Sequence, residues 1–429
     1  MNHRFHLGID RSDSSIDFCL LDETGTIVEQ GKVPSAPEDL QPWVLSLKAR
    51  LESGSDTIAA CIEQPCINLT HYFRQFDFLA LYLVNPAVIK RYRESLSASR
   101  AKDDRRDAHA LARFVLERHC ELQPWQPADE QTRALSALTE KRRQLVDLRT
   151  SITNKLTQAL KDTYPQSLEL VGRYLYSPLA CAFLNKWPTL AELRKARPAT
   201  IKTFYYTHGS RRPEVIEKRL TLIAGSVPLC TDPIELEVAT ELIRAFVKQL
   251  QALTASIARF DRLIAQATAK HEDAPIFTSL PGAGEVFASR LLAFFGSDRS
   301  VFTSAASLQQ LSGVAPLTKQ SGKMHFVHRR YGCNKFWRQT FVEWAAQTVM
   351  KSLWAKAYYQ RQKEKGHRHQ SILRSLAYKW QRILFRCWQC REAYDEKRYL
   401  NALEKSGSPL LKTIDAIRKT HPELCEQFS

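Results

Sequence analysis

Four acidic residues near the start of the chain have the types and positions that could bind divalent metal ions. Asp10 and Glu63 each end a short apolar run, and Asp104 and Asp107 lie three positions apart at the start of an apolar-periodic stretch. If that stretch is a helix, both acids share one of its faces. Carboxylates that a fold brings together repel one another unless a cation lies between them, and hard oxygen ligands of this kind suit Mg²⁺ or Mn²⁺.

A carboxylate cluster of this kind is typical of enzymes that act on phosphodiester bonds. Two metal ions about 3.5 to 4 Å apart can stabilise both the attacking and the leaving oxygen of a phosphodiester displacement. The four acids therefore predict nuclease or transposase chemistry. The alternative is that they are ordinary solvated acids at strand ends and at a helix start, where Asp104 would only complement the positive helix N-terminus. Two strand ends combined with an acidic pair favour the metal site.

A sheet and a helix are needed to position these acids. Apolar patterning predicts strands over 5–10, 15–21, 27–33, 57–63 and 79–84, and helices over 37–51, 66–76 and from about residue 104. The first three strands are separated by short turns and indicate an antiparallel meander, whereas helices between the later strands imply a parallel portion. Acids on the first strand, the fourth strand and the last helix are the layout of the ribonuclease-H-like fold in its RuvC-type form. We expect this α/β domain to span residues 1–122.

The net charge of the chain indicates a polyanionic partner. The 429 residues include 62 Lys and Arg against 45 Asp and Glu, which gives a formal charge of +17. Residues 319–398 carry most of this excess, with 19 Lys and Arg against 5 Asp and Glu. The sequence has no apolar run of about 18 residues and no secretory signal, and its ten cysteines are scattered. We therefore expect a cytoplasmic protein with reduced thiols and no membrane partner.

The middle of the chain, residues 123–275, predicts paired long helices. Apolar residues from 243 to 264 alternate steps of three and four, as in a coiled-coil seam, and a looser version of the pattern runs from 135 to 159. The two segments can pair within the chain as a hairpin or between chains as a dimer, and we favour an assembly of at least two subunits. The insertion between them, at about 165–233, is predicted to be a helical subdomain.

A mainly helical third domain is expected over residues 276–400, with a tail at 401–429. Near its start, Pro281-Gly282-Ala283-Gly284 precedes an apolar run and has the form of a helix-hairpin-helix turn. Small residues at such a turn would expose backbone N–H groups to a DNA phosphate. The alternative is a plain loop that starts a helix.

Farther along, Ser321 lies between two lysines and before a glycine, on a predicted loop. Its local surroundings favour a solvent-exposed turn residue. The helices predicted for the rest of the domain interleave aromatic and basic residues, so that outward-facing bases would contact phosphates and some rings could stack on unpaired bases. The candidate nucleic-acid contacts in this domain are Gly282, Gly284, Lys319, Lys323, Arg329, Arg330, Lys335 and Arg338.

These motifs together resemble the DEDD transposases of bacterial insertion sequences, the one-ten family, which also includes Piv-type DNA invertases. The resemblance runs along nearly the whole chain and depends on the order and spacing of its motifs. They are Leu7-Gly8-Ile9-Asp10, Ile62-Glu63, Lys102-x-Asp104-x-x-Asp107-Ala108, Trp187-Pro188-Thr189, Pro281-Gly282-Ala283-Gly284, Gly313-Val314-Ala315-Pro316 and Gln320-Ser321-Gly322-Lys323.

The resemblance implies roles for individual residues. Asp10, Glu63, Asp104 and Asp107 would bind Mg²⁺, and Ser321 would be the nucleophile that forms a phosphoserine link to DNA. The site would be composite, shared between the subunits of a homodimer or homotetramer in a bacterial, nucleoid-associated protein. A structured non-coding RNA would pair with donor and target DNA, so that base pairing selects the sequence while the basic surface holds the backbone.

The chain departs from the family pattern in two places. Asp103 stands where the family usually has a small hydroxyl residue, so either of two adjacent acids could be the ligand, and the family register favours Asp104. The middle insertion and the basic C-terminal part are also longer than in compact members.

Four hypotheses for the function follow. The first is an RNA-guided DNA recombinase that mobilises an insertion sequence through a serine nucleophile. The second is a RuvC-like DNA junction nuclease, which would use the acids and activated water and would need no serine. The third is an actin-like sugar kinase, since residues 7–15 echo a phosphate-loop strand, although no second Gly-rich motif follows. The fourth is a catalytically inactive nucleic-acid scaffold, which would tolerate Asp10→Asn.

Overall fold

The fold divides into two compact units, Met1–Pro127 and Ala128–Ser429. The computed structural model describes residues 3–51, 56–64, 67–96, 104–322 and 324–420. No helix among the described residues is both long and apolar enough to cross a membrane.

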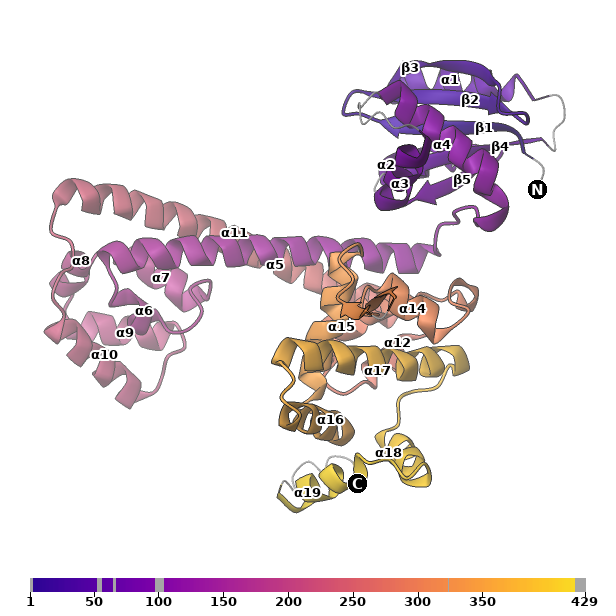
Figure 1. The fold of residues 1–429 in the computed structure, drawn as a ribbon. Helices are drawn as coiled ribbons and strands as arrows, with labels where there is room; N and C mark the ends of the chain where they lie inside the picture. The colour runs from indigo at the N-terminus through magenta and orange to yellow at the C-terminus, as the bar shows by residue number, and fades with distance from the viewer. Residues whose placement is uncertain (1–2, 52–55, 65–66, 97–103, 323, 421–429) are drawn as a thin grey trace. The chain divides into compact units, whose positions relative to one another are not determined.

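The first unit is built on a five-stranded mixed sheet with the order β3-β2-β1-β4-β5 (Figure 1). The strands are β1 (His3–Arg11), β2 (Ser15–Asp22), β3 (Ile27–Pro34), β4 (Thr57–Glu63) and β5 (Leu79–Val84). Strands β1, β2 and β3 pair antiparallel, whereas β1, β4 and β5 pair parallel. The predicted meander and the predicted parallel portion are both confirmed.

Helices cover both faces of this sheet because its central strands are apolar on both sides. Within β4, Ile58 and Ile62 pack into a core with α1 (Pro37–Lys48) and α2 (Ile67–Phe73). The intervening Cys61 packs on the other face with α3 (Pro86–Leu96) and α4 (Asp104–Arg118). Side chains of successive strand residues alternate between faces, and burial on both sides produces the continuous apolar runs of β1 and β4.

Helix α4 lies very close to β1, and Gly8 makes this approach possible. A Cβ atom at Gly8 would lie 2.0 Å from the carbonyl oxygen of Ala108 and 2.4 Å from the backbone nitrogen of Ala112. Small residues are thus required on both elements, which explains why α4 presents alanines to the sheet. The contact fixes the height and the direction of α4 above the strands.

We therefore expect Gly8→Ala to displace α4 and to destabilise the first unit by about 3 kcal/mol, because backbone atoms cannot yield as a flexible side chain does. Hydrogen exchange of the full chain should show faster exchange in β1 and α4. Gly225→Ala is the matched control, since nothing lies within 4 Å of a Cβ at that position. Unchanged protection in Gly8→Ala would contradict this packing.

Three histidine rings meet at the end of the sheet where β1 begins. His3 and His6 are 5 % and 2 % exposed, and their ring centroids lie 5.3 and 5.4 Å from that of His119. His3 contacts Thr57 Oγ1 at 2.8 Å and Tyr82 Oη at 2.9 Å, whereas neither ring nitrogen of His6 has a hydrogen-bond partner among the described residues. Burial, followed by the charge of His119, lowers the pKa of both His3 and His6 from 6.5 to about 4.

These lowered pKa values predict acid sensitivity. Between about pH 4 and 6.5 the unfolded chain binds more protons than the folded one, so stability is complete above pH 6.5 and falls as the pH drops toward 4. In the parent protein His6 adds up to one proton to the difference in bound protons between the unfolded and the folded chain. We expect His6→Phe to remove this contribution, so that the urea midpoint falls less steeply as the pH drops below 6.5. Replacement of His325, which is exposed in the second unit, should leave that slope unchanged. A His6→Phe profile identical to that of the parent protein would show that His6 does not contribute.

The second unit contains two long helices, α5 (Glu130–Thr163) and α11 (Pro233–Ala269), which pair antiparallel within the chain. Leu135 shares a core with Ile264, and Arg142 Nε donates to Asp261 Oδ1 at 2.6 Å. The prediction left open whether the seam pairs within or between chains, and the structure shows an intrachain hairpin. The insertion between the helices is helical, as expected, and consists of α6 (Ser167–Val171), α7 (Pro178–Lys186), α8 (Leu190–Lys195), α9 (Pro198–Thr207) and α10 (Pro213–Gly225).

The C-terminal part of this unit is mainly helical around a core rich in tryptophan. Trp344, Trp354, Trp380 and Trp388 are fully buried in it. Its helices are α12 (Ala274–Thr278), α13 (Gly284–Phe295), α14 (Ala305–Leu311), α15 (Lys335–Thr348), α16 (Leu353–Glu364), α17 (His369–Cys390), α18 (Glu396–Lys405) and α19 (Leu411–Thr420). A two-stranded hairpin, β6 (Leu317–Ser321) and β7 (Met324–His328), lies between α14 and α15.

Candidate active site

Asp10 and Glu63 lie side by side at the carboxyl ends of neighbouring parallel strands. Ile9 of β1 is in register with Ile62 of β4, so the two acids occupy the next position on each strand. Alternation along the strands places both on the face covered by α4, since Gly8 contacts that helix. Two carboxylates are thereby brought to one edge of one sheet face.

The direction of α4 brings the other two acids to the same edge. Near its start Ala108 touches Gly8, and just beyond its end His119 packs against His6, which lies earlier on β1. Helix α4 therefore runs antiparallel to β1 (Figure 1). Its first turn, which contains Asp104 and Asp107, lies toward the end of β1 that carries Asp10.

The side chain of Asp107 is paired with an arginine. It is 9 % exposed, and its Oδ2 accepts from Nη1 of Arg93 on α3. The side chain of Asp104 and the whole of Asp103 lie outside the described residues. Among the side chains that are described, no group of three His, Cys, Asp or Glu is close enough to hold a metal ion. The fold thus brings Asp10, Glu63 and the first turn of α4 to one edge, and the acids whose side chains are described there do not form a ligand set.

Sequence reasoning missed a fifth acid at this edge. Asp17 of β2 is the direct antiparallel partner of Asp10, is 5 % exposed, and faces Lys32 Nζ at 3.6 Å. Because Cys19, two residues farther along β2, packs against α4, Asp17 lies on the same face as Asp10. A single acid inside an otherwise apolar strand was the signal that could have identified it.

The chemistry of this edge suits a hard divalent cation. Its donors are carboxylate oxygens, which Mg²⁺ and Mn²⁺ prefer. Burial and the charge of Glu63 raise the pKa of the thiol of the neighbouring Cys61, which disfavours the thiolate that a soft metal would need. Buried carboxylates also require nearby positive charge, which Lys32 and Arg93 supply in this structure. A bound cation fits the same requirement.

Ser321 belongs to the β6–β7 hairpin, so the prediction that it lies on a loop is wrong. It is the last residue of β6 and pairs with Met324, the first residue of β7. The turn between them contains Gly322 at φ +55°, a left-handed conformation that glycine adopts without strain. Ser321 is exposed, and Lys323 lies outside the described residues.

The whole hairpin is open to solvent. Every described residue of both strands is exposed, and Met324, Phe326 and Val327 are 59 %, 51 % and 60 % exposed. A two-stranded hairpin is marginally stable alone, and contiguous exposed apolar side chains usually mark an interaction surface. Ser321 is therefore presented on an uncovered, partly apolar arm.

The predicted basic contacts differ in their surroundings. Lys319 on β6, Arg329 and Lys335 are exposed. Arg338 instead donates through Nη1 to the carbonyl oxygen of Arg330 at 2.7 Å and so holds the turn before α15. Arg329 and Arg330 lie in an irregular segment between β7 and α15, and not in a helix as predicted.

The glycine turn before α13 is held by α15. Trp344 Nε1 donates to the carbonyl oxygen of Pro281 at 3.1 Å, and a Cβ on Gly282 would lie 3.0 to 3.2 Å from atoms of Gln347. Gly284 is exposed at the first position of α13. Of the two predicted glycines, Gly284 is exposed at a helix N-terminus, whereas Gly282 is half-buried against α15.

Two domain families match this chain. An IS110-type DEDD domain, described as a transposase, matches residues 7–165, which include Asp10, Glu63, Asp104 and Asp107. A second domain, described as a transposase of the IS116/IS110/IS902 family, matches residues 274–360, which include Ser321. The two matched ranges together cover more than half of the chain.

Proteins named after insertion elements are similar to much of this chain. The chain is 28 % identical over 395 residues to a protein of Streptomyces coelicolor named mini-circle putative transposase for IS117, and the match covers 91 % of this chain and 95 % of that protein. It is 25 % identical to the IS110 uncharacterized 43.6 kDa protein of the same species, over 80 % of this chain and 85 % of the relative. It is 27 % identical to the IS900 uncharacterized 42 kDa protein of Mycobacterium paratuberculosis, over 64 % and 68 %.

Proposed function

Because this chain belongs to the IS110 family of transposases, which cut and rejoin DNA to move insertion sequences, we propose that it is an RNA-guided DNA recombinase with a serine nucleophile. DNA is the substrate that the family implies. The proposal assigns one role to the acidic edge of the first unit and another to the hairpin of the second unit.

The acidic edge would bind the divalent metal ions that this family typically uses. Asp10, Glu63, Asp104 and Asp107 would be the ligands, on a sheet whose mixed order is compatible with a RuvC-like domain at residues 1–122. Bound Mg²⁺, with Mn²⁺ as an alternative, would stabilise charge on the phosphoryl oxygens. In the structure Arg93 pairs with Asp107. A bound metal ion would compete with Arg93 for the Asp107 carboxylate, and a substrate phosphate would compete with Asp107 for Arg93, so this ion pair would open.

The exposed β6–β7 hairpin is the observation that carries the nucleophile assignment. Ser321 is the last residue of β6, next to the turn. The strand that follows the turn, β7, carries the exposed apolar residues Met324, Phe326 and Val327, which an assembly would cover. We infer that Ser321 reaches the acids when subunits assemble on DNA as a homodimer or homotetramer, and that Lys319 steadies the phosphate. A serine hydroxyl needs such activation, because it is a weak nucleophile by itself.

Sequence choice would be supplied by a structured guide RNA. The C-terminal part has a strong basic excess, and charge alone holds nucleic acid backbones without reading bases. We propose residues 276–400 as the transposase domain, 123–275 as the coiled-coil region with its insertion, and 401–429 as a tail. In the bacterial cell the protein would act at the nucleoid.

One experiment separates this function from its main alternative, a RuvC-like junction nuclease. The purified protein, its co-purifying RNA and Mg²⁺ are incubated with labelled DNA that contains the element ends. Strand exchange, together with a labelled band that survives denaturation and disappears after protease treatment, is the expected result. Product ends free of protein, with no joined strands, would favour water-mediated hydrolysis. Sequencing the RNA that co-purifies tests the guide directly.

A further inference from the structure

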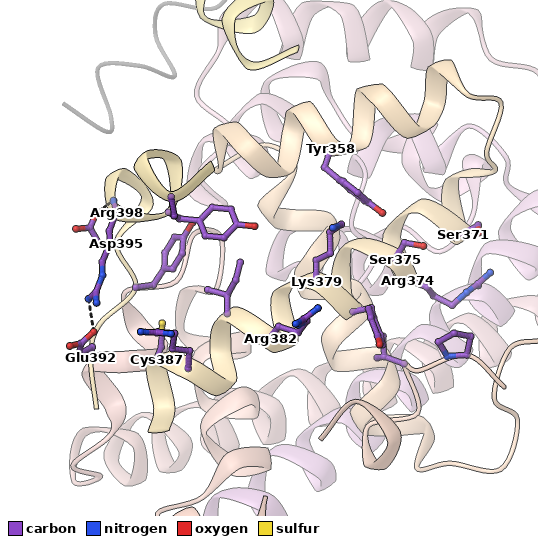
Figure 2. Close-up of a pocket in the computed structure, with 18 of the residues that line it drawn as sticks. Tyr358, Ser371, Arg374, Ser375, Lys379, Arg382, Cys387, Glu392, Asp395 and Arg398 are labelled. Carbon is purple, nitrogen blue, oxygen red and sulfur yellow. Dashed lines mark hydrogen bonds and ion pairs between the residues drawn. The ribbon is translucent and has the colours of Figure 1, made fainter. Parts of the chain in front are cut away.

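The C-terminal part of the second unit contains a cavity of about 1060 Å³ (Figure 2). It lies between α16, α17 and the segment that leads into α18, and its lining includes His328 and Arg329 at the base of the β6–β7 hairpin. Ligand cavities usually hold about 300 to 1,000 Å³, so this one is at the upper limit. None of the roles proposed above uses it.

One face of α17 forms a wall of this cavity. Ile372, Leu376 and Trp380 occupy the opposite face and are buried in the core. The cavity face carries polar and basic residues at helical spacing. They are Ser371, Arg374, Ser375, Tyr378, Lys379, Arg382 and Arg386. The basic positions from 374 to 386 extend over about 18 Å along the helix.

The cations on this wall lack acidic partners. Among the described residues, Arg374, Lys379 and Arg382 form no ion pair. The acids of the lining are already engaged at its far end, where Glu392 pairs with Arg398 at 2.6 Å and Asp395 accepts from backbone N–H groups of α18.

Burial lowers the pKa of two of these cations, and the charges of neighbouring cations add to the effect. Burial, followed by the charges of Arg329 and Arg338, lowers the pKa of Arg374. Burial, followed by the charge of Arg382, lowers the pKa of Lys379. A polyanion inserted here would relieve this repulsion.

Aromatic rings line the same space. Lys379 Nζ lies 5.2 Å from the ring centroid of Tyr358, which is partly exposed on α16. Figure 2 shows Tyr358 above Lys379, with Arg374 and Arg382 on either side along α17. Cations lined up beside an aromatic ring are an arrangement by which proteins hold unpaired nucleotides.

We propose that this cavity binds a single strand of nucleic acid, with phosphates along Arg374, Lys379 and Arg382 and a base against Tyr358. Stacking on a protein ring requires an unpaired base, which a duplex does not offer. RNA and DNA strands share the phosphates and the π-faces that the site recognises, and the two probes below distinguish them. The cavity meets the base of the hairpin, so a strand held here leads toward β6 and β7.

Binding is tested with the full chain carrying Ser321→Ala, in EDTA, so that the result does not depend on catalysis. Fluorescent 12-nucleotide single strands of RNA and of DNA, and the matching DNA duplex, serve as probes. For Lys379→Ala with Arg382→Ala, we expect about tenfold weaker single-strand binding. We also expect the plot of the logarithm of the binding constant against the logarithm of the salt concentration to be less steep. The magnitude of its slope should fall by about 1.4, which is 0.7 for each lost phosphate contact.

The matched control removes two exposed lysines outside the cavity, Lys363→Ala with Lys365→Ala, and should retain parental affinity. Tyr358→Phe should bind as the parent does, whereas Tyr358→Leu should lose about tenfold. Comparison of the RNA and DNA single-strand probes identifies the occupant, which is the one that binds more strongly. Equal losses in the control pair, unchanged single-strand binding in the cavity pair, or equal competition by polyglutamate of the same charge would each overturn the proposal.

Discussion

Ser321→Ala is expected to abolish strand exchange and the covalent protein–DNA species, with a loss of at least about 10⁴-fold in rate. Removing the nucleophile of a covalent mechanism leaves only the contributions of binding and electrostatics, and losses near 10⁶ are known for serine enzymes. Because the Ser321 side chain is exposed at the end of β6, its removal should leave the fold intact. RNA binding should also stay near the parental level.

Thr318→Ala supplies the control for this experiment. Thr318 is another exposed hydroxyl residue of β6 and pairs with Val327. Its loss should leave strand exchange within a few-fold of the parent protein, because it does not stand at the tip of the hairpin. Ser321→Cys distinguishes the chemical role further, since a thiolate can attack phosphorus yet forms a different protein–DNA link. A Ser321→Ala protein that still yields the covalent species would exclude Ser321 as the nucleophile.

Asp10→Asn should reduce Mg²⁺-dependent strand exchange by at least about 10³-fold, because an amide oxygen carries no charge to hold the ion or to offset the phosphate. Asp10 has the most constrained position of the proposed ligands, between Glu63 on one neighbouring strand and Asp17 on the other. We expect DNA binding without metal to persist. Mg²⁺ titration calorimetry and strand exchange in Mg²⁺ and in Mn²⁺ would measure the loss.

Asp17→Asn is the matched comparison. Asp17 lies on the same face but is paired with Lys32, and the proposal gives it no ligand role. We expect it to retain strand exchange within about tenfold of the parent protein. A loss as large as that of Asp10→Asn would make Asp17 a ligand, and full activity of Asp10→Asn would end the metal assignment and favour a non-catalytic scaffold.

Much of the first unit could be predicted because its local patterns are strong. The continuous apolar runs that end at Asp10 and Glu63 predicted buried strands, and both lie at the same edge in the structure. The seam from 243 to 264 likewise predicted a long paired helix, since steps of three and four are hard to produce otherwise. These features are encoded in residues close together in the sequence.

The features that could not be predicted depend on contacts between distant segments. The sequence marks Asp17 as an acid within an apolar strand, but its place beside Asp10 depends on the register of β1 and β2, and the ion pair of Asp107 depends on how α3 packs on α4. The hairpin of Ser321 was taken for a loop because both strands are short and solvent-exposed, so neither has the one-sided apolar alternation that marks a half-buried strand.

The antiparallel pair of α5 and α11 sets the distance between two hydrophobic cores. One end contributes Leu135 and Ile264 to the tryptophan-rich core, and the other contributes Leu156 and Val247 to the core of the insertion. A helix of 37 residues measures about 55 Å. Because both cores are built on this one helix pair, adding or removing whole heptads of α5 and α11 would change the distance between them.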